Sequence, residues 1–135
     1  MSKGHAKHHE RHHGLSLFGK DLVRRCSSKC ELCEAHGVKL KVFEVPPIEA
    51  EPNFDHCIMI CEACQGQIDK PRTIDPNYWR FLANAMWSSV PPVKIMSVTM
   101  LRHLADKNDW ASELLEQVYL EPDEDAWLVK VPPLD

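Results

Sequence analysis

Glycine is scarce in this chain of 135 residues, which contains only five glycines. Loops that cradle phosphate need glycines at fixed spacings, and none of the patterns GxxxxGKS/T, GxGxxG, GxSxG or HExxH occurs. No apolar run approaches the ~20 residues that a membrane-spanning helix requires. The first fourteen residues have no apolar centre and are unlike a secretory signal. We therefore expect a cytoplasmic protein without a membrane anchor and without a complete catalytic motif, more consistent with a non-enzyme than with an enzyme.

Charge is distributed unevenly along the sequence. Residues 1–45 contain nine Lys/Arg, five Asp/Glu and six of the eight histidines, whereas residues 46–135 contain seven Lys/Arg and fifteen Asp/Glu. A basic head is suited to an anionic partner, but its excess is small. Attraction between the two halves, or simple solvation, is therefore favoured over nucleic-acid binding, and a protein partner is the more plausible ligand.

Apolar spacing predicts an N-terminal helix and then a β-hairpin. Leu15, Phe18 and Leu22 recur at intervals of three and four, which is typical of one helical face. The polar, His-rich residues before them either fray or begin that helix. Alternation from Val38 to Val45 predicts a half-buried strand, and the apolar run Cys57–Cys61 predicts a second one after a polar loop.

The second half of the sequence predicts helices. Helix starts with Asp or Pro at the first positions occur at Asp75, Pro91, Asp109 and Pro122. We therefore expect the α+β class, with a small zinc-ribbon-like β-hairpin region followed by a helical region of three to four short helices. The expected organisation is a flexible His-rich tail at 1–14, a helix plus zinc-ribbon-like domain at 15–70, and a helical region at 71–135 packed on the ribbon.

Two cysteine pairs give the most specific chemical signal. Cys30 and Cys33 form one C-x2-C pair, and Cys61 and Cys64 form another after 27 intervening residues. Zinc takes four tetrahedral thiolate ligands, and a two-residue spacing lets one tight turn aim both sulfur atoms at the same ion. Iron also accepts four thiolates, so zinc is the favoured metal but not the only candidate. Four cysteines leave no position for a catalytic water, so the predicted Zn²⁺ site is structural.

The two other cysteines and the histidines are further candidate metal ligands. Cys26 and Cys57 each lie four residues before a C-x2-C pair. They can replace a ligand, form a redox pair or be small buried residues, and we favour burial. The N-terminal histidines can chelate a metal, but a polar tail without a specific role is the simpler interpretation for His5, His8, His9, His12 and His13. His36 and His56 flank the ribbon and could ligate if a cysteine did not, and His103 is interpreted as a satisfied core or boundary residue.

The sequence resembles the PhnA family, which is named for a gene within the alkylphosphonate-utilisation operon. The resemblance rests on SLFGKDL at 16–22, SKCELCEA at 28–35, VFEVPP at 42–47, CIMICEAC at 57–64 and WRFLANAMW at 79–87. It covers roughly residues 15–128 and implies the N-terminal zinc-ribbon region of that family, with the four cysteines of the two C-x2-C pairs as ligands. Longer members similar to this carry a further small β-barrel, which this sequence does not contain.

Three functions are compatible with the sequence. A zinc-stabilised binding or adaptor module is favoured. A degenerate nuclease is an alternative, because the order of cysteine turn, strand, loop, strand and cysteine turn looks like the scaffold of HNH nucleases. Their catalytic metal is held at the end of the first strand, where only Glu44 offers a carboxylate here. A redox or metal-handling role for Cys26, Cys57 and the His-rich head is the second alternative.

Overall fold

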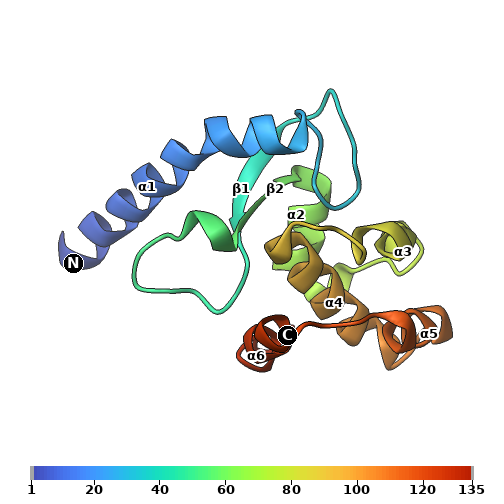
Figure 1. Ribbon diagram of the computed structural model, residues 1–135. Coiled ribbons are helices and arrows are strands. Elements are labelled where there is room, and N and C mark those ends of the chain that lie inside the picture. Colours follow the sequence, from blue (N-terminus) through green and yellow to red (C-terminus); the bar gives the residue numbers. More distant parts are fainter. Residues whose placement is uncertain (1, 135) are drawn as a thin grey trace.

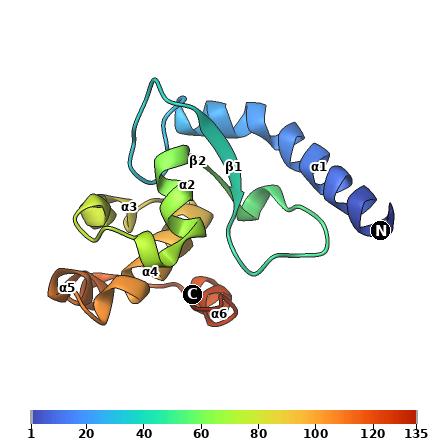
Figure 2. The ribbon, with the colours of Figure 1, turned by 180° about the vertical axis from the view of Figure 1, so that it is seen from behind.

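The structure is a computed structural model that describes the backbone of residues 2–134 and the side chains of residues 11 and 13–134. It has the expected α+β architecture, in which one antiparallel hairpin lies between a long N-terminal helix and a group of short helices (Figures 1 and 2). The strands are β1 (Leu40–Glu44) and β2 (Cys57–Cys61), and the α-helices are α1 (Ser2–Cys26), α2 (Glu62–Asp69), α3 (Leu82–Ala85), α4 (Pro91–Ala105), α5 (Asp109–Gln117) and α6 (Pro122–Val129). Short 3-10 helices cover Phe54–His56, Pro71–Thr73 and Tyr78–Phe81.

The hairpin is the centre of the molecule. Leu40 pairs with Cys61 at one end, and Glu44 pairs with Cys57 at the other. All five residues of β2 are buried, which follows from coverage of the hairpin on both faces. Helix α1 lies on one side of the hairpin and helices α2 to α6 lie on the other (Figure 1). The second cysteine pair, Cys61 and Cys64, therefore starts from a strand that is fixed by packing on both faces.

Helix α1 is held on the hairpin by a small apolar cluster. Leu22, Cys57 and Met59 are buried in it, and Phe18 and Phe54 pack against them with their rings edge to face at 5.5 Å. The expected apolar face of this helix is thus the face that is buried. The backbone of α1 begins at Ser2, so the His-rich segment belongs to the helix, the second of the two possibilities for it.

The larger core joins the opposite face of the hairpin to the helical region. Ile58 and Ile60 of β2 share one cluster with Trp79 and with most of α4, in which ten of fifteen residues are buried. Burial on this scale contributes roughly 25 cal/mol per Å² of apolar surface removed from water. Helix α6 is fastened to the hairpin loop, because the Trp127 indole donates a hydrogen bond of 2.9 Å to the Pro46 carbonyl and stacks on His56. The helical region is therefore packed directly on the hairpin.

Several elements differ from the sequence prediction. The first strand is shorter than Val38–Val45 and covers only Leu40–Glu44. The helix expected after Asp75 divides into a 3-10 turn and the single α-turn of α3. Helix α2 was not predicted, because its sequence is polar and lacks a wide apolar stripe. Among residues 2–134, none of the helices combines the length and the apolar character needed to cross a bilayer.

Candidate metal centre

The four cysteines of the two C-x2-C pairs converge on one point. Cys30 and Cys33 lie in the turn after α1, Cys61 ends β2, and Cys64 lies in the first turn of α2. Their sulfur atoms all lie within 4.8 Å of one another, and among the described residues this is the group that could hold a metal ion. Three of the four side chains are buried, and only Cys33 is partly exposed. The sequence therefore identified the residues that the fold brings together.

The spacing of the sulfur atoms fits a tetrahedral ion. The Sγ atoms of Cys30 and Cys64 are 3.9 Å apart, and those of Cys33 and Cys61 are 3.7 Å apart. With zinc–sulfur bonds of ~2.3 Å, a tetrahedral shell places neighbouring sulfur atoms about 3.8 Å apart. Both shortest contacts join one cysteine turn to the other. A single ion bound by all four sulfurs would therefore cross-link the two turns, which is the chemistry that a structural metal supplies.

The two turns are built alike around their sulfur atoms. The backbone N–H of Cys33 donates to the Cys30 Sγ at 3.5 Å, and the backbone N–H of Cys64 donates to the Cys61 Sγ at the same distance. Each first cysteine thus receives a hydrogen bond from the residue three positions later. The second of these amides belongs to the N-terminal turn of α2, where the helix dipole also favours negative charge. These donors stabilise thiolates, the form that binds metal.

In the absence of a metal, the four sulfurs cannot all carry a charge. The hydrogen bond shared by the Cys30 and Cys64 sulfurs lowers the pKa of Cys30 to about 5 and raises the pKa of Cys64. Burial raises the pKa of the Cys33 thiol to about 11. The site therefore holds a thiolate at Cys30 and retains protons on Cys33 and Cys64 at neutral pH. A divalent cation would displace those protons, since metal binding requires thiolates.

Tyr78 contributes a hydroxyl group to the centre that the sequence did not reveal. Its oxygen lies 3.2 Å from the Cys64 Sγ and 3.9 Å from the Cys61 Sγ. The ring packs edge to face against Trp79 and Phe81, which holds the hydroxyl in place. Burial, followed by the contact with Cys64, raises the pKa of Tyr78 above its usual value, so the hydroxyl keeps its proton. It can therefore donate to a thiolate, and no residue spacing in the sequence indicates such a donor.

Glu31, inside the first cysteine turn, ties this turn to β2. Its carboxylate accepts two hydrogen bonds from Arg25, at 3.0 and 2.7 Å, and one of 2.9 Å from the Met59 backbone N–H. In return the Glu31 backbone N–H donates to the Met59 carbonyl at 2.8 Å. Arg25 also donates to the carbonyl of Cys57. These contacts fix the first turn against the strand that leads to the second turn.

The two remaining cysteines lie in the apolar cluster under α1. Cys57 is fully buried, and burial raises the pKa of its thiol to about 11. Its Sγ donates to the Asn53 carbonyl at 3.3 Å, while the Cys26 Sγ lies 3.6 Å from the Val23 carbonyl. Neither belongs to the sulfur group at the metal centre. Burial is therefore confirmed for Cys57, whereas Cys26, the last residue of α1, is only partly buried.

The candidate histidines whose side chains the structure describes lie outside the cysteine cluster. His36 is exposed, and His56 stacks on Trp127 with its Nδ1 2.8 Å from a carboxylate oxygen of Glu49. His103 lines a groove beside α4. The side chain of His13 is exposed, whereas those of the other four on α1 lie outside the described part of the chain: His5, His8, His9 and His12.

Glu44, the one carboxylate at the position of the nuclease ligands, is engaged by α1. Both of its carboxylate oxygens accept hydrogen bonds from the Arg11 guanidinium, and that of Nε to Oε2 measures 2.8 Å. Arg11 also donates to the Ala50 carbonyl at 3.2 Å. A carboxylate held in this way is occupied as an anchor for the helix. Coordination of a catalytic ion by Glu44 would require loss of this bidentate pair.

The arrangement as a whole is suited to holding a metal ion tightly and without reaction at the ion. Four thiolates complete a tetrahedral shell, and no water position remains for hydrolysis. Thiolate sulfur is a ligand for zinc and for iron alike. Comparison with known proteins adds no assignment, because no protein-family model, curated protein or solved structure matches this chain.

Proposed function

We propose that the protein is a small zinc-binding module in which Cys30, Cys33, Cys61 and Cys64 hold one structural Zn²⁺. The observation that carries the proposal is the sulfur spacing of 3.7–3.9 Å between the two turns, together with the closed four-thiolate set. Structural zinc supplies ~10–16 kcal/mol of apparent folding free energy. Whole domains are stable by only ~5–15 kcal/mol, so the ion would decide whether the hairpin folds.

Metal analysis of the purified full chain tests the zinc site. We expect one zinc per chain by elemental analysis and four sulfur neighbours by X-ray absorption. Cys61→Ser should lose the ion, whereas Cys57→Ser, which removes a thiol outside the cluster, should retain it. Equal metal content in the two variants, or a shell that contains nitrogen or oxygen, would contradict the assignment.

We further propose that the module acts by binding a protein partner. The support for binding rather than catalysis is that both candidate catalytic positions are occupied. The predicted four-thiolate shell leaves no open position on the metal, and the Glu44 carboxylate is paired with Arg11. Trp79 is buried in the core, but Trp87 is 56% exposed beside the first cysteine turn. Large aromatic side chains are enriched at interaction hot spots. Crosslinking in cell extracts should capture a reproducible partner that Trp87→Ala loses, with Tyr119→Ala, another exposed aromatic, as the matched control.

A relationship to the PhnA family is part of this proposal. Two of the sequence segments on which the resemblance rests have clear structural roles. The segment at 16–22 supplies Phe18 and Leu22 to the apolar cluster between α1 and the hairpin. The segment at 57–64 supplies β2 and the second cysteine turn. A structure of a PhnA-family zinc-ribbon region provides the test. The same hairpin register and the same long helix across it are expected, and a different helix position would argue against common descent.

The nuclease alternative has a direct assay. Plasmid nicking in the presence of magnesium or manganese should be absent, because Arg11 occupies the Glu44 carboxylate. Nicking that disappears in Glu44→Ala would replace the adaptor proposal with an enzymatic one. The redox alternative predicts reversible oxidation of Cys57, which its burial and raised pKa disfavour.

A further inference from the structure

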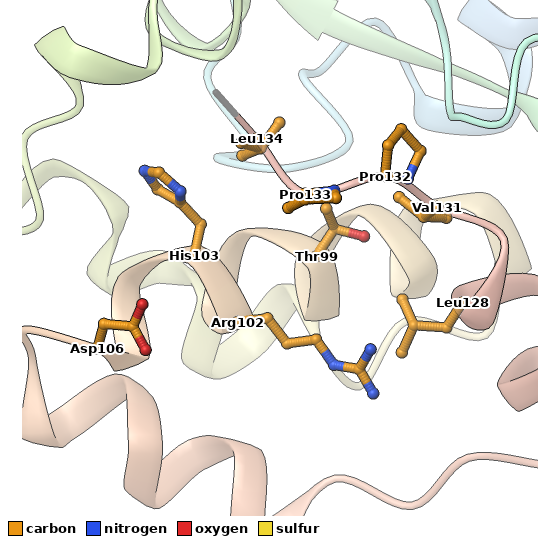
Figure 3. Close-up of a pocket in the computed structure, with 9 residues that line it drawn as sticks. All are labelled: Thr99, Arg102, His103, Asp106, Leu128, Val131, Pro132, Pro133 and Leu134. Atoms are coloured by element: carbon orange, nitrogen blue, oxygen red, sulfur yellow. The ribbon is translucent and has the colours of Figure 1, made fainter.

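A groove runs along the C-terminal half of α4, on a part of the molecule that the metal centre does not use. One section, of about 350 Å³, lies between α4 and residues 131–134, and the next, of about 550 Å³, lies between α4 and residues 71–76. The two sections share His103, Asp106 and Leu134, so they are continuous. In Figure 3, residues 131–134 pass over the helix, and His103 and Thr99 project toward them. Pockets of this size hold small organic molecules.

The inside of the groove combines polar groups with an apolar floor and apolar walls. Leu104 and Leu128 are buried beneath it, and Ile74 and Leu134 are partly buried along its walls. Thr99 adds no free donor, because its hydroxyl donates to the Ile95 carbonyl at 2.8 Å. An apolar group of a ligand would therefore find contact surface on these four side chains.

The rim of the groove is cationic. Arg72, Arg102 and Lys107 line it, with His103 between them, and Asp106 is its one acidic residue. In Figure 3 the Arg102 guanidinium extends along the edge of α4. Among the described side chains, those of residues 11 and 13–134, no carboxylate forms a salt bridge with any of these three cations.

This concentration of positive charge stands out against an acidic background. Residues 46–135 contain only seven Lys/Arg against fifteen Asp/Glu. Arg80 lies over the Trp110 ring at 4.6 Å and Lys94 pairs with Glu124 at 2.9 Å, which engages two of the seven. Three of the remaining five line this one groove.

We propose that the groove is a binding site for a small organic anion, in which a carboxylate or phosphate group meets the cationic rim and an apolar body fills the interior. Arg102 lines the section beside residues 131–134 and Arg72 lines the section beside residues 71–76, so each section offers a guanidinium to an anionic group. Guanidinium groups suit this role because they present paired donors to carboxylate and phosphate oxygens.

The test uses the metal-loaded full chain and three probes of similar shape: phenyl phosphate, benzoate and the neutral benzyl alcohol. Proton–nitrogen NMR titration should shift the amides of residues 99–108 with both anions, with the more highly charged phenyl phosphate binding more tightly. Benzyl alcohol should bind at least about tenfold more weakly than either anion, as expected for the loss of a charged hydrogen bond.

Arg72→Gln and Arg102→Gln should each weaken phenyl phosphate binding about tenfold. Both side chains are exposed, so the variants should fold, and an unchanged melting temperature checks this. Lys20→Gln removes the same charge from an exposed position on α1 and should leave the affinity unchanged. Equal loss in all three variants, equal binding of benzyl alcohol, or shifts confined to other residues would overturn the proposal. Metal content is measured on the same samples, so a failure of zinc binding is distinguished from a failure of anion binding.

Discussion

Replacing Tyr78 with phenylalanine isolates the contribution of one hydroxyl group to the metal centre. The phenolic oxygen is 3.2 Å from the Cys64 sulfur, and the ring is held by Trp79 and Phe81. Phenylalanine preserves the ring and its packing but removes the hydrogen bond. When metal binds, all four sulfurs must be thiolates, so the hydroxyl then donates to a charged acceptor. The variant should therefore weaken metal binding more than it weakens the fold.

The expected magnitude follows from the kind of hydrogen bond that is lost. A hydrogen bond to a charged group contributes about 1.5–3 kcal/mol, and about 1.4 kcal/mol corresponds to a tenfold change in an equilibrium constant. Tyr78→Phe should therefore raise the dissociation constant for zinc by about 10- to 100-fold, which is the usual range for partners of metal ligands.

A chelator competition measured by absorbance gives the two dissociation constants on the same scale. Tyr119→Phe is the matched control, because Tyr119 is the only other tyrosine and is 68% exposed. Cobalt substitution supplies a second signal, since loss of a donor to sulfur changes the sulfur-to-cobalt charge-transfer bands. Equal zinc affinity in the Tyr78 and Tyr119 variants would refute the assignment of the hydroxyl to the metal centre.

Four other outcomes are expected. Chelation of the metal should abolish cooperative thermal unfolding of the hairpin, because about 10 kcal/mol or more of folding free energy is lost. Zinc affinity should rise with pH, since the raised pKa values of Cys33 and Cys64 leave both thiols protonated at pH 7; calorimetry in buffers of different ionisation enthalpy should show those protons released. Leu22→Ala should cost about 2–5 kcal/mol in urea denaturation, because Leu22 is the fully buried residue of α1 in the cluster with Cys57 and Met59. Trp127→Phe should cost about 1 kcal/mol in the same assay through loss of the bond to Pro46, and an unchanged midpoint would contradict that role.

The cysteine cluster could be predicted from the sequence because the spacing that defines each cysteine pair lies within one short segment. A C-x2-C pair places two sulfurs in one turn regardless of the rest of the fold, and the apolar strand Cys57–Cys61 brings the second turn into position. The β2 bounds and the start of α4 followed from a short apolar run and from paired prolines for the same reason. Local sequence patterns were therefore sufficient to predict the four clustered cysteines and the fold class.

The features that could not be predicted depend on contacts between distant segments. Tyr78 reaches the sulfurs only because the turn at 78–81 packs beside α2, and nothing in its own neighbourhood signals this. Arg11 and Glu44 are separated by 33 positions and form a pair only after α1 crosses the hairpin. Likewise, the cationic groove combines α4 with segments before and after it. Such sites require tertiary packing, which periodicity and spacing do not encode.

The bond between Trp127 and Pro46 spans 81 positions and has a bearing on how the chain assembles during synthesis. The hairpin and all four sulfurs leave the ribosome well before α6 does, so the metal could close the two turns while the hairpin loop is still untethered. Contacts of such sequence separation form late because closing a long loop costs entropy. Metal capture and the locking of the loop are therefore separable steps, and a nascent chain stalled after residue 105 should already retain the ion.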